Sequence, residues 1–518
     1  MTKKILCLLL IFLLAIISCD KNPVPDQIRT EEKTVNSSEE SYEPDEPETK
    51  PEPETENITD EISEPETFTV ENALPDPEPE TQNPETEAVT DETTEIIEPV
   101  KNPLFKLPRK PAALTKESLL EDFDYLTRTL EESYPFYGTA LRKFKIDLHK
   151  QTDIARAAVE ALDTSKTETQ ILDEFSRIIS AYIVTPLRTM GHLIGLWAGG
   201  SRYDVQLALI KLDSGYKVPW YPNLYADHLD RMFTSPAALR YYGNPLANVD
   251  LDSYIKSILN TPVPNNVTFD VIVPGSVAYI RMRSMNTANY GLDGELIAAF
   301  GKTIGGFDHL IVDLRGNQGG SAEIFLRHIV APLIDKPASL FYYVFFKGGD
   351  HCLMFDDIYR RDLQWQLENG LLLHADDSRF PVCEILPYLT GADADDFASL
   401  CYGFKREITV APAANRWEFD GKIWILIDGG AYSAAEISAA LAKESGFATL
   451  VGQPTFGSFG GYTAAFISLP NTGVIIRYDY GYVTDLQGRS LEEFGITPDI
   501  YNRPGMDALA TVLALISG

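Results

Sequence analysis

The chain has 518 residues, of which 76 are acidic and 44 basic, so its formal net charge at pH 7 is −32. Residues 20–100 alone contain 27 acidic and four basic residues, a net charge of −23. The acidity therefore belongs mostly to one segment and says little about the substrate of the rest, and a chain of this charge is not expected to bind nucleic acid.

Residues 1–18 have the pattern of a secretion signal. Lys3 and Lys4 precede the apolar run ILCLLLIFLLAII, which has the length of a signal-peptide core and is short for a membrane-spanning helix. The run ends in IISC, which resembles the site where a bacterial lipoprotein is cleaved before Cys19 and acylated on its thiol. Two acyl chains would anchor the protein to a membrane of the bacterial cell envelope, on its periplasmic or surface face. The alternative is an ordinary secretion signal in which Cys19 is incidental.

Residues 19–103 repeat Pro, Glu and Thr, as in EPDEPETKPEPETENITDE, and contain few large apolar side chains. Such a segment cannot bury enough apolar surface to offset the loss of chain entropy, so we predict a disordered linker. We favour a spacer between membrane and folded part over an acidic ligand-binding tail. The remaining residues suffice for two or three packed units.

Residues 104–190 are predicted to form a small helical domain. In TKESLLEDFDYLTRTLEESYP, Leu119, Phe123 and Leu126 recur at helical spacing behind Thr115, a residue suited to cap a helix. The segment TETQILDEFSRIISAYI repeats the pattern, and TPLRTMGH follows as a loop.

Residues 191–518 are predicted to form an α/β core, because apolar strands alternate with helices from residue 276 onward. The expected strands are 276–282, 309–314, 422–428 and 448–452; the expected helices are 293–305, 322–334 and 434–446; and a hairpin is expected at 463–481. A polar, cysteine-bearing stretch at about 345–415 interrupts this alternation. We interpret it as an insertion that covers the active-site side.

No metal or other cofactor is expected. The glycines at 316–320 do not match the GxGxxG or Walker patterns of nucleotide sites. Cys352, Cys383 and Cys401 lack the spacing of a zinc site, although export would permit one disulfide among them.

Two junctions between a strand and a helix carry candidate chemistry. In LIVDLRGNQGGSAEIF, Gly319 and Gly320 allow positive φ and can turn backbone N–H groups toward an anion at a helix start. A tetrahedral oxyanion is one possible guest, and a tight turn without function is the alternative.

The second junction is ILIDGGAYSAAEISAALAKESG, in which Ser433 opens a helix. Ser433 with Glu436 three residues later fits a capping box. The small residues that follow also leave room for a substrate carbonyl, whose oxygen could bind the Ala434 N–H and the glycine loop. Local residues alone leave cap and nucleophile both open.

The motifs YIRMRSM, LIVDLRGNQGG, GAYSAAEI, VGQPTFGS and GRSLEEFGITPDI resemble, in order and spacing, those of the tail-specific, or C-terminal processing, serine peptidases. The resemblance covers about 276–503 without the insertion. It implies a crotonase- or ClpP-like core that acts on peptide or protein substrates. It further implies Ser433 as nucleophile and an oxyanion hole from Gly319, Gly320 and the Ala434 N–H.

The resemblance also bears on the general base. In one branch of the family the base is a lysine in TFGKG, but this chain has TFGSF, with Ser458 at that position. Lys443 lies ten residues past Ser433 on the same predicted helix, about 15 Å along its axis, so a lysine dyad is excluded.

The other branch resembles the tricorn core peptidase and uses a histidine and a glutamate. Its pattern falls on His192 in TMGHLIGLW and on Glu492 in LEEFGITPD. Gly191 replaces the serine that links the two in that branch, so a water or Thr189 would have to bridge them.

We therefore expect a membrane-anchored serine endopeptidase in which His192 removes the proton of Ser433. A catalytically degenerate peptidase fold that binds peptides or small apolar ligands is the main alternative, and the missing lysine and linking serine favour it. A structural lipoprotein of the envelope would explain the anchor and linker but not the five motifs.

Overall fold

The structure is a computed structural model that describes residues 113–518 with several gaps. The gaps are residues 189, 201, 205–206, 208–209, 211–222, 251–252, 255–256, 258–262, 369–377 and 463. The predicted signal peptide, the acylation site Cys19, the linker at 19–103 and the bridging residue Thr189 lie outside the described residues.

The first described part of the chain is helical, as predicted, with four helices in succession. They are α2 (Lys116–Ser133), α3 (Tyr137–Phe144), α4 (Leu148–Glu160) and α5 (Glu168–Ile179). The Thr115 hydroxyl caps α2 by accepting from the Ser118 N–H at 3.2 Å. The apolar positions of α2 that recur at helical spacing are buried, so packing of one face holds the helix in place.

A buried carboxylate joins α2 to a distant turn of the chain. Asp122 accepts hydrogen bonds from the backbone N–H groups of Asn471 (2.8 Å) and Thr472 (2.7 Å) and from the Thr472 hydroxyl (2.6 Å). Burial raises the pKa of Asp122 to about 6, although these hydrogen bonds oppose the shift. The helical region is therefore attached to the core by specific polar contacts.

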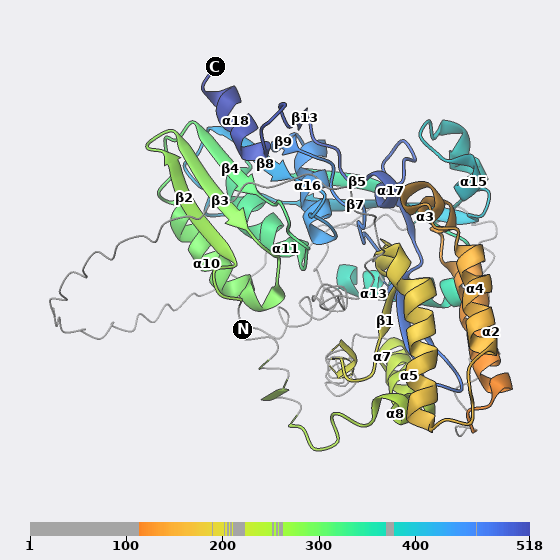
Figure 1. Ribbon diagram of the computed structural model, residues 1–518. Coiled ribbons are helices and arrows are strands. Elements are labelled where there is room, and N and C mark those ends of the chain that lie inside the picture. Colours follow the sequence, from red (N-terminus) through yellow and green to blue (C-terminus); the bar gives the residue numbers. More distant parts are fainter. Residues whose placement is uncertain are drawn as a thin grey trace, which may run out of the picture. The chain divides into compact units, whose positions relative to one another are not determined.

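The core contains a six-stranded sheet in the order β13-β9-β8-β4-β3-β2 (Figure 1). Its strands are β2 (Val267–Val273), β3 (Val277–Met282), β4 (His309–Asp313), β8 (Lys422–Ile427), β9 (Thr449–Gly452) and β13 (Ile500–Tyr501). Neighbouring strands are parallel except β2, which runs antiparallel to β3 at the edge. The α/β class predicted from alternating strands and helices is confirmed.

Helices cover both faces of this sheet, which explains why its strands are apolar on both sides. On one face, α18 (Ala508–Ile516) packs on alternate residues of four strands, namely Val277, Ile311, Trp424, Leu426 and Val451. The intervening residues join the main core with α10 (Tyr290–Gly301), α11 (Ala322–Phe325) and α16 (Ala434–Glu444). The helix predicted at 322–334 is interrupted by a π-helical turn at 326–330 before α12 (Ala331–Leu333).

A second sheet includes both ends of the segment predicted as an insertion. It has the order β12-β5-β7-β6, with β5 (Ala338–Phe346), β6 (Phe380–Pro381), β7 (Tyr402–Val410) and β12 (Tyr482–Thr484). β5 and β7 pair along their full lengths, from Ala338 with Val410 to Phe346 with Tyr402. The segment predicted as an insertion at 345–415 thus begins inside one strand and contains the next. Only residues 347–401 lie between the paired strands.

A third sheet brings the chain near residue 192 to the C-terminal hairpin. Its order is β1-β11-β10, with β1 (Ile194–Leu196), β10 (Ala464–Ser468) and β11 (Ile475–Asp479). β1 pairs antiparallel with β11, Ile194 opposite Arg477, so the residues just before β1 lie near the end of β11. This pairing joins segments that are almost 300 residues apart in the sequence.

The remaining helices of the described chain connect strands of these sheets. They are α7 (Asn223–Phe233), α8 (Pro236–Tyr242), α13 (Asp350–Glu368), α14 (Val382–Ile385), α15 (Ala394–Phe397) and α17 (Leu491–Phe494). None of the helices in the described ranges is both long enough and apolar enough to cross a membrane.

Candidate active site

Ser433 stands between strand β8 and helix α16 in a strained conformation. Its φ and ψ are 58° and −126°, and few residues other than glycine adopt positive φ in the part of the chain that the structure describes. Such a conformation costs about 1–3 kcal/mol and persists only where neighbouring contacts enforce it. The Ser433 N–H donates to the Ser458 carbonyl at 2.9 Å, which is one such contact. Strain of this kind at a helix start favours a functional serine over a simple cap.

Glu436 supplies the other contacts that hold this turn. Its carboxylate accepts from the N–H groups of Ser433 (3.2 Å), Gly457 (2.8 Å) and Ser458 (2.8 Å) and from the Thr455 hydroxyl. The predicted capping interaction from Glu436 to Ser433 is therefore present, but it is one of four. Complete burial raises the pKa of Glu436 to about 7, against the effect of these donors.

The glycine loop after β4 approaches Ser433 closely. A Cβ atom added to Gly319 would lie 2.8 Å from the Ser433 Cβ and 2.9 Å from the Ala434 nitrogen. At Gly320, where φ is 131°, a Cβ would lie 2.0 Å from the Met285 carbonyl oxygen. Both positions need glycine, because a Cβ would collide with the Ser433 turn at Gly319 and with the Met285 backbone at Gly320.

The three predicted oxyanion residues differ in what they offer. The Gly319 N–H already donates to Asn317 Oδ1 at 2.8 Å, so Gly319 contributes close approach and not a free donor, which departs from the expectation. Within the described part of the chain, the N–H groups of Gly320 and Ala434 have no hydrogen-bond acceptor. The Ala434 N–H follows Ser433 directly and the Gly320 N–H lies on the loop that contacts it, so both remain available to a negatively charged oxygen.

His192 is buried in a turn just before β1. Its Nδ1 lies 2.6 Å from Asp479 Oδ2 at the end of β11, and the two side chains are 3% and 6% exposed. A Cβ at Gly460 would lie 2.5 Å from His192 Cε1, so the backbone of Gly460 lies directly against the ring. A carboxylate on Nδ1 fixes the imidazole orientation and leaves Nε2 to accept a proton.

Glu492 lies near this pair but bonds to the backbone. Its carboxylate accepts from the Gly191 N–H at 3.0 Å and from the Phe459 N–H at 2.8 Å. Burial and the nearby charge of Asp479 raise its pKa, while the charge of His192 lowers it. The expected bridge through Thr189 lies outside the described residues. The imidazole contacts Asp479, and Glu492 orients the chain on either side of the ring.

Gly191 lies where two aromatic rings leave no room for a side chain. A Cβ at this position would lie 2.5 Å from the Phe136 ring and 2.8 Å from the Tyr134 ring. Both rings are fully buried, and the Tyr134 hydroxyl donates to the Met190 carbonyl at 2.8 Å. Aromatic side chains of the helical region thus occupy the space that a serine would need.

One short segment contacts both the serine and the histidine. Ser458 accepts from the Ser433 N–H, and Gly460 lies against the His192 ring. Two residues of extended chain span at most about 7 Å. Ser433 and His192 therefore contact backbone positions that lie within about that distance of each other. Lys443, in contrast, donates to the Thr497 carbonyl at 2.8 Å and is engaged elsewhere.

Sequence reasoning missed Asp479, although its strand contained a signal. Asp479 ends the run IIRYD, every residue of which is buried. An acidic residue in a fully buried strand requires a partner, because an unpaired buried charge is costly. The sequence did not identify that partner, since His192 lies 287 residues away.

Comparison with known proteins adds a family match. Residues 276–502 match the sequence model described as "Peptidase family S41". No curated protein matches the chain.

Several solved structures are similar at low identity. A putative peptidase from Parabacteroides merdae is 16% identical, with coverage of 77% of this chain and 96% of that one and a TM-score of 0.43. Mature CPAF complexed with lactacystin is 14% identical, with coverage of 74% and 94% and a TM-score of 0.41. A lipoprotein from Streptococcus agalactiae is 14% identical, with coverage of 78% and 98% and a TM-score of 0.36.

Proposed function

This chain belongs to peptidase family S41 through residues 276–502 and is a serine-type peptidase, and from that premise we propose that Ser433 is its nucleophile and His192 its general base. The observation that carries the proposal is the convergence on segment 458–460. There the strained Ser433 and the buried His192–Asp479 pair meet the same stretch of backbone. The reaction is endopeptidase cleavage of peptide or protein substrates through an acyl-enzyme.

The first half of the reaction forms the acyl-enzyme. Ser433 Oγ attacks the carbonyl carbon of the scissile bond while His192 Nε2 takes the hydroxyl proton. The electron pair displaced from the carbonyl resides on its oxygen, which the N–H groups of Gly320 and Ala434 stabilise. The imidazolium then returns the proton to the leaving nitrogen as the C–N bond breaks, and Asp479 stabilises the imidazolium throughout.

The second half releases the acyl group. A water molecule gives one proton to His192 Nε2 and attacks the ester carbon. The same two N–H groups stabilise the second oxyanion. When it collapses, the bond to Ser433 Oγ breaks, the serine regains its proton from His192, and a free carboxylic acid leaves.

Covalent labelling with a fluorophosphonate, a reagent that phosphonylates activated serines with loss of fluoride, tests the proposal. The parent should be labelled on Ser433, Ser433→Ala should not be labelled, and Ser445→Ala, at the other end of α16, should behave as the parent. His192→Ala should slow labelling by about 10²- to 10⁴-fold, as loss of a general base does. Labelling of folded His192→Ala at the parental rate would remove His192 from the mechanism.

A catalytically degenerate protein that binds peptides or small apolar ligands is the second candidate. It is favoured by Ser458 at the lysine position and by the aromatic rings that exclude a serine at position 191. A folded parent that is not labelled, yet is thermally stabilised by peptides, would support this candidate.

We also propose that the mature chain is a lipoprotein of the bacterial cell envelope, anchored through Cys19. The support is the sequence alone, with its basic start, apolar core and the cysteine that follows a small residue. Cys19→Ala should move the mature protein from the detergent phase to the soluble envelope fraction. Unchanged partitioning would contradict the anchor.

A further inference from the structure

Lys143, in the last turn of α3, reaches the segment that contacts Ser433. Its Nζ donates to the carbonyl oxygens of Gly457 (3.0 Å) and Glu492 (2.6 Å) and to that of Phe456. An ammonium group has three N–H donors, and here each has a carbonyl acceptor. Lys143 is therefore a hydrogen-bond donor to the backbone and not a candidate base.

Lys143 and Glu436 hold the same two peptide groups from opposite ends. In the peptide between residues 456 and 457, the carbonyl binds Lys143 and the N–H binds Glu436. In the next peptide, between residues 457 and 458, the carbonyl again binds Lys143 and the N–H again binds Glu436. Each peptide dipole has its negative end at the cation and its positive end at the carboxylate, which is the favourable orientation for both.

Close packing at Gly457 restricts the movement of this backbone segment. Gly457 has φ of 81°, and a Cβ there would lie 2.6 Å from Lys143 Nζ and 2.5 Å from the Glu492 carbonyl oxygen. The Lys143 ammonium also lies 4.6 Å from the centre of the Phe456 ring, within the range of a cation–π contact. The backbone at 456–458 is thus fixed immediately before the Ser458 carbonyl that accepts from Ser433.

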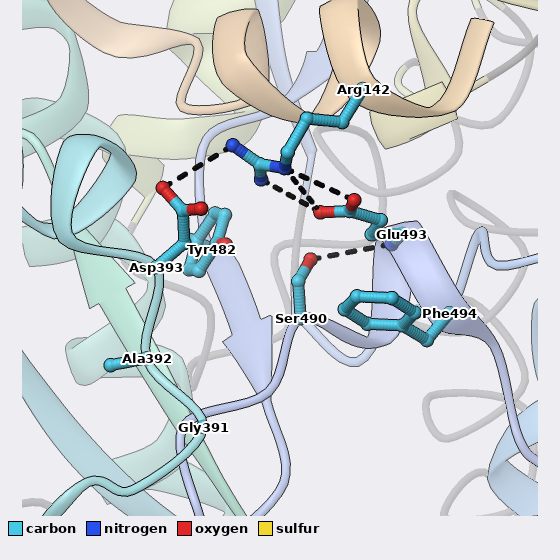
Figure 2. Close-up of a pocket in the computed structure, with 8 residues that line it drawn as sticks. All are labelled: Arg142, Gly391, Ala392, Asp393, Tyr482, Ser490, Glu493 and Phe494. Carbon is cyan, nitrogen blue, oxygen red and sulfur yellow. Dashed lines mark hydrogen bonds and ion pairs between the residues drawn. The ribbon is translucent and has the colours of Figure 1, made fainter.

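The residue beside Lys143 anchors the same helix end to α17 (Figure 2). Arg142 contacts the Glu493 carboxylate at 2.7 Å and Asp393 at 3.3 Å. Figure 2 shows Arg142 reaching from α3 toward both carboxylates. These residues line a cavity of about 200 Å³. Two adjacent cations of α3 therefore bind successive residues of α17, because Lys143 binds the Glu492 carbonyl.

We propose that Lys143 is a positioning residue for the Ser433 site, supplied by the helical region. Its ammonium orients the peptides at 456–458 so that the Ser458 carbonyl holds the Ser433 N–H and Gly460 stays against His192. The expected effect on the labelling rate of Ser433 rests on the proposed function. The expected effect on the backbone at 456–458 does not. In this chain Ser458 stands where relatives have the catalytic lysine, and a cation from another part of the sequence binds the backbone beside it.

Labelling kinetics measure the consequence for acylation. Lys143→Met keeps much of the aliphatic stem and removes the charge, and Lys150→Met, an exposed lysine on α4, is the matched control. We expect the maximal labelling rate constant of Lys143→Met to fall about ten-fold or more at an unchanged half-saturating fluorophosphonate concentration, because misplacement reduces reactivity and not encounter. Lys143→Cys converted to aminoethylcysteine restores the ammonium and should recover most of the rate, with the identically treated parent as reference.

Hydrogen exchange measures the structural consequence without catalysis. In Lys143→Met, the amides of Ser433, Gly457 and Ser458 should exchange at least about ten-fold faster, while the β3–β4 strands remain protected. Unchanged exchange at these amides, or a parental rate constant in folded Lys143→Met, would overturn the inference. A parent that is not labelled would instead refute the proposed function, and the exchange result would still decide the role of Lys143.

Discussion

The substitution Asp479→Asn tests which carboxylate serves the imidazole. The variant keeps the size of the side chain but removes the charge 2.6 Å from His192 Nδ1. A hydrogen bond to a charged group contributes about 1.5–3 kcal/mol, and each 1.4 kcal/mol corresponds to a ten-fold change in rate. The lost contact alone therefore slows acylation by about ten- to a hundred-fold. An amide that stabilises the wrong tautomer can extend the loss to about 10⁴-fold.

Glu492→Gln is the matched comparison, because Glu492 is the carboxylate that the family pattern favours. Its two oxygens accept from the Gly191 and Phe459 N–H groups, so the amide must turn an NH₂ toward one of those donors. We expect a loss of unfolding free energy of about 1–3 kcal/mol and a smaller loss of acylation rate than in Asp479→Asn.

The assay is the second-order rate of fluorophosphonate labelling at neutral pH, with chemical unfolding measured on both variants. Asp479→Asn should remain folded but be labelled slowly. Glu492→Gln should have a lower unfolding free energy but be labelled faster than Asp479→Asn. Parental labelling by Asp479→Asn together with a large loss in folded Glu492→Gln would show that the structural assignment of the orienting carboxylate is wrong.

Three further predictions address stability and reactivity. Burial raises the Asp122 pKa from 3.8 in the unfolded chain to about 6 in the folded one. The contribution of Asp122 to stability is therefore present below about pH 4 and is lost as the pH rises through 6. In urea titrations, the stability advantage of the parent over Asp122→Asn should shrink by about 2–3 kcal/mol between pH 4 and pH 7. Gly191→Ser should destabilise the fold by about 1–3 kcal/mol and not restore a linking serine, since aromatic rings fill its space; an unchanged melting temperature would contradict this. Burial raises the pKa of Cys352 to about 12, so a thiol reagent should modify the exposed Cys383 and Cys401 in the native protein and Cys352 only after unfolding. Fast modification of Cys352 itself in the native protein, read by peptide mapping, would refute its burial.

The main elements of the fold followed from local sequence. Strands such as β4 and β8 are short apolar runs bounded by turn residues, and α2 carries its own cap and apolar face. Ser433 and the glycine loop were also visible, because a strand, a glycine turn and a helix start lie within a few residues of each other. These are short-range patterns, which periodicity and turn chemistry determine.

The predicted insertion overlaps two paired strands at its ends, because strand pairing is a long-range property that the local sequence does not show. β7 is polar at several positions, so its sequence resembles a loop more than a buried strand. Its pairing with β5 across the whole strand became visible only in the folded chain. The local pattern of a partly polar strand does not identify its partner.

The sequence by itself determined which residues could act, and the tertiary structure decided which of them lie together. Ser433, His192 and Glu492 could be named from motifs, whereas the contact of His192 with Asp479 depends on the antiparallel pairing of β1 with β11. The role of Lys143 likewise depends on where α3 packs, since its acceptors lie more than 300 residues away. The residue type fixes which functional group a side chain carries. Its pKa, partners and orientation depend on groups that only folding brings within hydrogen-bond distance.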